Sequence, residues 1–278
     1  MITIRTFAPL INETIDYMKT VIIPVDFSET SNNAAHYAVQ LLTGHYGVDM
    51  ILYHMYEKSS QAEEVNKDLE KLKKDLLQKG IVKISIYSEK GDDLIDELEK
   101  LARHREADLI IMGITGRSSL SQLFIGSNTL KMVEKKVCPV LIIPPNAKYK
   151  DVKNVLLTSD MQNVTVSTPS VPIKKILKTF QPNLHIINVS SEHYVALTEE
   201  YQKERAKLKE MFTDFNPEFY FLGWYDVDEA INRFAHDKKI DFIIIIPKEH
   251  SLVDKMFRHS HTKELVYHSD IPVLAVHE

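Results

Sequence analysis

The stretch GITGRSSLSQLFIGSNT, residues 113–129, combines three glycines with several hydroxyl side chains. Gly113 and Gly116 allow the backbone to approach a ligand closely and to adopt positive φ. Gly126 opens a helical pattern, and the free N–H groups and positive dipole end of a helix N-terminus attract anions. The hydroxyls after Gly126 add small donors. The pattern predicts a phosphate-binding loop, although glycines between a strand and a helix are often only turn residues.

This loop follows an apolar run and is one of several places where strand-like and helical patterns alternate. The runs TVIIPV, MILYHM, KISIYS, DLIIMG and PVLIIP indicate strands, and the helical pattern after the first of them has Ser28 as its expected N-cap. The alternation predicts a doubly wound, Rossmann-like α/β fold with five parallel strands. Ligands of such sheets lie beyond the carboxyl ends of the strands, where the strand order reverses. The loop that begins at Gly113 lies at that edge.

The chain repeats itself. KTVIIPVDFSE and KNVLLTSDMQN place Asp26 and Asp160 134 positions apart, and ILYHM and HIINV have the same spacing. DLIIMG and DFIIII, like CPVLII and IPVLAV, are 133 positions apart. We therefore expect two tandem domains, 18–146 and 151–278, preceded by an extension, 1–17, of unknown role.

The spaced glycines occur together with two strand motifs that point to a known family. The order G-x2-G-x9-G-S from Gly113, with IPVDFSE at 23–29 and ILYHM at 51–55, resembles the nucleotide-binding signature of the universal stress protein family. The resemblance extends over both repeats and implies a tandem universal stress protein that binds ATP, with or without Mg²⁺.

The resemblance implies a role for each matching residue. Asp26 would lie near the nucleoside, the Met55 backbone would meet adenine, and Arg117 would reach the terminal phosphate. The remaining positions would surround ribose and phosphate: Gly113, Gly116, Gly126, Ser127, Asn128 and, as an additional donor, Thr129. For these residues the competing interpretations are a loop or cap residue at Asp26, core packing at Met55, a first-turn residue at Thr129 and a solvated arginine.

The second repeat departs from the pattern. Ile246, Glu249 and His259 stand at the positions of the three glycines, so two side chains fill space that the backbone needs and a carboxylate opposes an anion. We expect this repeat not to bind ATP. Its histidines, of which His259 and His261 are closest in sequence, are interpreted as surface or capping residues, and no metal site is predicted.

Composition excludes several classes of function. A net charge of −5 without a basic stripe argues against nucleic acid, and no apolar run is long enough for a membrane span. Cys138 is the single cysteine, which suits a reducing cytoplasm. No P-loop lysine and no G-x-S-x-G elbow is present, so we expect no catalytic residues.

Three functions stay open at this point: an ATP-binding regulatory protein with an unidentified protein partner, an interaction scaffold that binds no nucleotide, and a slow ATP hydrolase. The glycine spacing favours the first. The family resemblance implies that the last strands, CPVLIIP (138–144) and IPVLAVH (271–277), pair within the chain as an intrachain pseudo-dimer, joined by the linker 145–151. The apolar edges would then cover each other. The sequence does not show whether two chains associate further into a homodimer.

Overall fold

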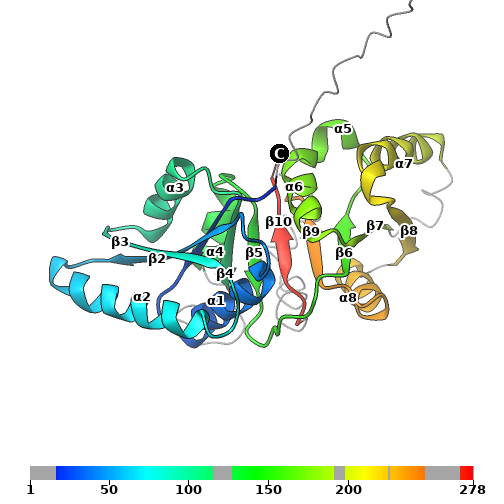
Figure 1. Cartoon of the computed structure of the whole chain (residues 1–278). Helices are drawn as coiled ribbons and strands as arrows, with labels where there is room; N and C mark the ends of the chain where they lie inside the picture. The colour runs from blue at the N-terminus through cyan, green and yellow to red at the C-terminus, as the bar shows by residue number, and fades with distance from the viewer. Residues whose placement is uncertain (1–16, 115–126, 191–197, 225, 248–269, 278) are drawn as a thin grey trace, which may run out of the picture.

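The computed structural model describes residues 17–114, 127–190, 198–224, 226–247 and 270–277, and of Ser127 and Asp228 only the backbone. Its centre is one ten-stranded sheet in the order β3-β2-β1-β4-β5-β10-β9-β6-β7-β8 (Figure 1). The elements of the first half are β1 (Thr20–Pro24), α1 (Glu29–Leu42), β2 (Asp49–Tyr56), α2 (Ala62–Leu76), β3 (Lys83–Lys90), α3 (Leu94–His104), β4 (Leu109–Gly113), α4 (Ser127–Glu134) and β5 (Val140–Ile143). Those of the second half are β6 (Asn154–Thr158), α5 (Val164–Ser167), α6 (Ser170–Phe180), β7 (Asn183–Ser190), α7 (Glu199–Met211), β8 (Glu218–Gly223), α8 (Val227–Asp237), β9 (Phe242–Ile245) and β10 (Val273–Ala275).

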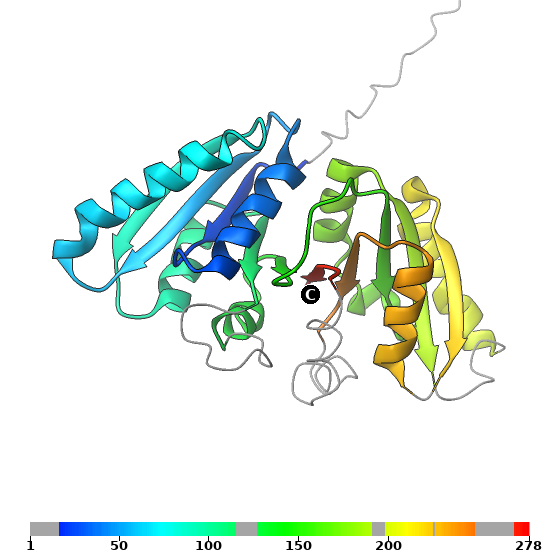
Figure 2. The ribbon, with the colours of Figure 1, turned by 90° about the horizontal axis from the view of Figure 1, so that it is seen from below.

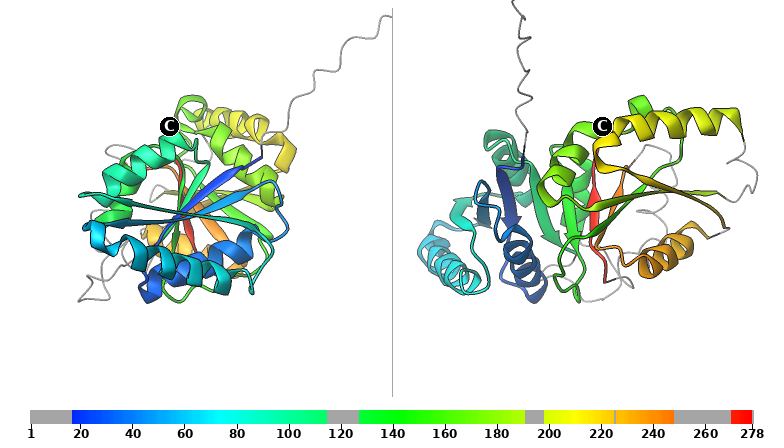
Figure 3. Two further views of the ribbon diagram at one scale, coloured as in Figure 1. Left: turned by 60° about the vertical axis from the view of Figure 1, so that its left-hand side comes forward. Right: turned by 45° about the vertical axis from the view of Figure 1, so that its right-hand side comes forward.

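The strands form where the sequence has short β-branched runs, and helices cover both faces of the sheet (Figures 2 and 3). Helices α1, α2, α6 and α7 contribute to one buried cluster, and α3, α4 and α8 contribute to the other. The central strands are buried almost throughout, as in β1, where four of five residues are buried. Two apolar faces explain why these strands read as continuous apolar runs rather than alternating ones.

The two halves have the same strand order, which confirms the predicted α/β fold. Within each half all strand pairs are parallel, and the two orders are mirror images about the centre of the sheet. At the centre β5 and β10 pair antiparallel, from Val273 opposite Ile142 to Ala275 opposite Val140. The carboxyl ends of the strands in the two halves therefore point to opposite edges of the sheet.

Equivalent aspartates repeat the same capping geometry in both halves. Asp108 Oδ2 accepts hydrogen bonds from the N–H groups of Lys19 and Thr20 at 2.6 and 3.0 Å. Asp241 Oδ2 accepts from those of Lys153 and Asn154 at 2.7 and 2.8 Å. These bonds join the start of the fourth strand of each half to the start of its first strand, so the sequence repeat is also a repeat of local structure.

Side chains also connect the halves. Lys175 of α6 lies with its Nζ 2.6 Å from Asp108 Oδ1, and both side chains are largely buried. On α1, the ring of Tyr37 packs edge-on against that of Tyr149, in the segment that joins the halves, at 5.6 Å between centroids. No helix among the described residues is long and apolar enough to cross a membrane.

Candidate functional site

The strand order of the first half reverses between β1 and β4, and the candidate site lies at their carboxyl ends. The two strands are parallel neighbours, with Val21 opposite Leu109 and Ile22 opposite Ile110. Asp26 follows the end of β1, and Gly113 is the last residue of β4. The structure therefore brings to one edge two residues that lie 87 positions apart in the sequence.

Asp26 shapes the turn that leads into α1. Its Oδ1 accepts from the N–H of Ser28 at 3.0 Å, and its own N–H donates to Ser31 Oγ at 3.3 Å. Between them Phe27 has a φ of 60°, a left-handed conformation that is uncommon outside glycine. Ser28 then caps α1 by accepting from the N–H of Ser31, as the sequence predicted. The hydrogen bonds of Asp26 thus stabilise the turn from which α1 begins, at the carboxyl end of β1.

The Met55 backbone lies beyond the last residue pair between β1 and β2. That pairing stops at Pro24 opposite Tyr53, followed by a bond from the N–H of Val25 to the Tyr53 carbonyl at 2.8 Å. The N–H and carbonyl groups of alternate residues in a strand point to the same side. Those of Met55, two residues after Tyr53, therefore point toward the β1 side of β2, beyond the point where β1 stops pairing with it. The next acceptor on that side, the Val25 carbonyl, lies 2.7 Å from His54 Nδ1 instead.

His54 is a supporting residue that the sequence analysis missed. Its ring stacks on Phe27 at 4.9 Å between centroids, and its Nδ1 must carry the proton to bond the Val25 carbonyl. The repeat contained a signal: the equivalent position holds Asn188, whose Nδ2 donates to the carbonyl of Ser159 at 2.9 Å. A polar residue at the same place in two apolar strands indicates a shared hydrogen bond. The Met55 side chain itself packs against the core, beside Gly91.

Gly113 is required for a different reason from the one predicted. The sequence analysis expected positive φ, but among the described glycines only Gly44 has it, at 88°. A Cβ on Gly113 would lie 2.7 Å from the Thr30 carbonyl oxygen and 3.0 Å from its carbon. The missing side chain therefore lets α1 approach the end of β4, since these are backbone atoms and cannot rotate away.

Helix α4 begins at the same edge, and its first turn is joined to β4. Ser127 is its first residue, and Asn128 is exposed. Thr129 is buried, and its hydroxyl donates to the Gly113 carbonyl at 2.9 Å. The hydroxyl of Thr129 is thus bonded within the protein, which favours the interpretation as a first-turn helix residue over that of an additional donor to a ligand. The N-termini of α1 and α4 both meet the end of β4 at Gly113.

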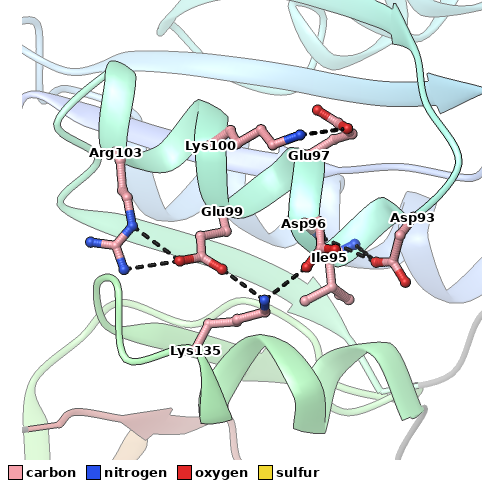
Figure 4. A network of polar contacts seen from close by, with 8 residues as sticks. All are labelled: Asp93, Ile95, Asp96, Glu97, Glu99, Lys100, Arg103 and Lys135. Carbon is pink, nitrogen blue, oxygen red and sulfur yellow. Dashed lines mark hydrogen bonds and ion pairs between the residues drawn. The ribbon is translucent and has the colours of Figure 1, made fainter.

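A network of charged groups holds the other end of α4 against α3 (Figure 4). Lys135 Nζ lies 2.8 Å from both Asp96 Oδ1 and Glu99 Oε2, and Arg103 also bonds Glu99. Hydrogen bonds to Asp96 and Glu99 raise the pKa of Lys135, and Lys135 in turn lowers the pKa of Glu99. Both partners remain ionised at neutral pH. The network fixes α4 between α3 and the sheet.

The remaining predicted site residues cannot be placed. Gly116, Arg117 and Gly126 lie outside the described residues, as do Glu249 and all of the histidines from His250 to His268. Of the nine predicted residues, the structure brings together Asp26, Gly113, Ser127, Asn128 and Thr129, and it places Met55 one strand away on β2.

The corresponding edge of the second half keeps the turn but changes the helix. Asp160 Oδ1 accepts from the N–H of Gln162 at 3.1 Å, and Met161 has a φ of 56°, as at Asp26 and Phe27. Ile246 replaces Gly113, and its side chain is buried in the core. After the turn at Asp160, where the first half has the single helix α1, the described part of the second half has two shorter helices, α5 and α6, on either side of Pro169.

Comparisons with known proteins agree with this architecture. The sequence profile of the universal stress protein family matches residues 18–144 and 183–277. Universal stress protein MJ0531 of Methanocaldococcus jannaschii is 28% identical over 141 residues, 45% of this chain and 81% of that protein. A universal stress protein from Archaeoglobus fulgidus superposes with a TM-score of 0.66 at 16% identity, over 93% of this chain and 96% of its own.

A transport protein shares the fold at greater distance. The cytoplasmic domain of a prokaryotic cation chloride cotransporter superposes with a TM-score of 0.54 at 10% identity, over 93% of this chain and 95% of its own, a likeness of fold alone. The family profile, by contrast, matches in two segments, one in each half of the mirrored sheet. This chain belongs to the universal stress protein family, in a tandem form.

Proposed function

We propose that the first half of the chain, 18–146, binds ATP at the β1–β4 edge and that the protein acts as a nucleotide-responsive regulatory protein. The observation that carries this proposal is the meeting of two helix N-termini, those of α1 and α4, at Gly113. The N–H groups of a helix's first turn and the positive end of its dipole favour an anion such as a phosphate tail, although at α1 the N–H of Ser31 is already bonded to Ser28.

The adjacent strand supports the nucleoside part of this proposal. The N–H and carbonyl groups of Met55 point toward the β1 side of β2, beyond the last residue pair between β1 and β2. A flat base with its own donors and acceptors could bond them there, as a neighbouring strand would. Asp26 follows the end of β1 and is the carboxylate that we propose to lie near the nucleoside. Gly116, Arg117, Gly126, Ser127 and Asn128 complete the proposed set, on the strength of the family signature and without catalytic roles.

The second half, 151–278, is proposed to bind no ATP. Ile246 supplies a side chain where Gly113 has none, and the broken α5–α6 pair leaves the edge without the first half's long helix. This half would instead complete the sheet through β10 and offer a surface to a partner protein. We place the protein in the cytoplasm on the evidence of its sole cysteine.

Calorimetric titration of ATP with Mg²⁺ into the full chain tests the proposal. We expect one site per chain, which Gly126→Asp abolishes by placing a carboxylate against the phosphate, while His259→Asp at the equivalent position of the second half leaves binding intact. No heat from the wild-type protein, and no nucleotide released when a fresh preparation is denatured, would favour the scaffold function. Turnover well above that of Gly126→Asp would favour the hydrolase.

A further inference from the structure

Thr129 is the one hydroxyl among the described residues that joins the two flanks of the glycine-rich loop. Its Oγ1 donates to the Gly113 carbonyl at 2.9 Å across 16 positions of sequence, and Thr129 is only 2% exposed. Hydroxyls in the first turn of a helix usually bond the backbone of that same turn. Here the hydroxyl reaches another element, the last residue of β4.

The acceptor of this bond is itself held in place. Gly113 pairs with Ile143 in the register of β4 and β5, and on another side it faces the backbone of Thr30. The carbonyl oxygen that Thr129 bonds is therefore a fixed point of the sheet. One turn further along α4, Met132 and Val133 are buried in the core, and Lys135 bonds α3 beyond them.

Different contacts hold the two turns of α4. The buried side chains and Lys135 fix the second turn and the end of the helix, whereas the bond from Thr129 fixes its first turn. The first turn carries the N–H groups that the proposed function assigns to phosphate. An error of about 1 Å in such groups is enough to weaken an electrostatic contact, so their placement matters as much as their number.

We infer that Thr129 is a positioning residue for the nucleotide: by holding the Gly113 carbonyl, its buried hydroxyl sets the distance between the end of β4 and the N-terminus of α4. The inference rests on the proposed function for its nucleotide. It differs from the role implied by the family resemblance, because the hydroxyl acts through the helix and does not touch the ligand. A positioning role predicts an effect on α4 before any nucleotide is added.

The test combines ATP titration with hydrogen–deuterium exchange of the peptide that contains α4, measured without nucleotide. Thr129→Val keeps the shape of the side chain and removes the hydroxyl, whereas Thr129→Ser keeps the hydroxyl. Thr158→Val is the matched control, since Thr158 Oγ1 donates to the Ile244 carbonyl at 3.2 Å, between strands of the second half. All variants are made in the full chain.

We expect Thr129→Val to weaken ATP binding about tenfold, the effect of losing one buried hydrogen bond, and to speed exchange in α4. Thr129→Ser should bind within about threefold of wild type, because it restores the donor. Thr158→Val should leave both ATP binding and α4 exchange unchanged, since its hydroxyl lies in the other half.

Several results would overturn the inference. Wild-type affinity in Thr129→Val would show that the bond does not matter for the site, and weakened binding with unchanged α4 exchange would make Thr129 a direct ligand. An equal loss of affinity in Thr158→Val would point to general destabilisation. An equal loss in Thr129→Ser, which keeps the hydroxyl, would assign the effect to the shape of the side chain. If the wild-type protein binds no ATP, the proposed function fails, and α4 exchange still decides whether Thr129 positions the helix.

Discussion

Replacement of Gly113 by alanine tests whether the close approach of α1 to β4 depends on the missing side chain. The new Cβ would lie 2.7 Å from the Thr30 carbonyl oxygen, where ordinary contacts begin at 3.4 Å. Because the obstacle is backbone, relief requires α1 to retreat by several tenths of an ångström or β4 to bend. Overpacking of this kind costs about 1–3 kcal/mol in the free energy of unfolding.

The assay is urea and thermal unfolding of the full chain, followed by circular dichroism. For a chain of this size a loss of about 1–3 kcal/mol lowers the midpoint by about 2–12 °C. Gly47→Ala is the matched control, since no atom lies within 4 Å of its new Cβ and Gly47 lacks positive φ. We expect that control to match or slightly exceed wild-type stability. If both variants unfold at the same midpoint, the argument from the Thr30 contact is wrong.

Three further predictions concern the contact between the halves and two partly buried titratable groups, His277 and Cys138. Lys175→Met removes the cation facing Asp108, whose side chain is 10% exposed, and should lower the free energy of unfolding by about 1–3 kcal/mol, less than for a fully buried pair. Lys100→Met, at a side chain 69% exposed, should lower the free energy of unfolding much less, and equal losses would refute the contrast. Burial, with the charge of Lys136, lowers the pKa of His277 from 6.5 to about 4. The folded state therefore binds this proton less readily than the unfolded chain, so stability falls as the pH drops from 6.5 toward 4. His277→Gln should flatten that fall in urea titrations at a series of pH values, and an unchanged slope would assign it to other groups. Burial raises the pKa of Cys138 to about 12, so Ellman's reagent at pH 8 should label the native protein far more slowly than the urea-unfolded chain, and equal rates would contradict that burial.

The fold was readable because its determinants are local and repeated. Apolar runs of four to eight residues alternate with helical patterns, and two copies of this pattern at a nearly constant spacing predict two equivalent halves. The place of the candidate site follows from the same pattern, since Asp26 comes directly after one strand and Gly113 ends another, and parallel strands carry their carboxyl ends to one edge. The pairing of β5 with β10 was expected from the family resemblance, and the structure has it.

Other features depend on contacts between residues far apart in sequence, and no local pattern encodes them. That Gly113 must lack a side chain follows from the Thr30 backbone, 83 positions away, and not from the turn chemistry that its type suggested. The sequence does not show that the hydroxyl of Thr129 is buried and bonded to the Gly113 carbonyl, 16 positions away, because that contact depends on how α4 packs against β4. His54 looked like one more residue of an apolar strand until its ring was seen to bond Val25.

The sequence by itself therefore determined the layers, the repeat and the edge at which a ligand would lie, because periodicity and strand order follow from neighbouring residues. Only the tertiary structure decided which atoms at that edge are already used by the protein. A hydrogen bond or a close backbone contact depends on distances of a few tenths of an ångström, and those distances are set by the packing of α1, α4 and the sheet together.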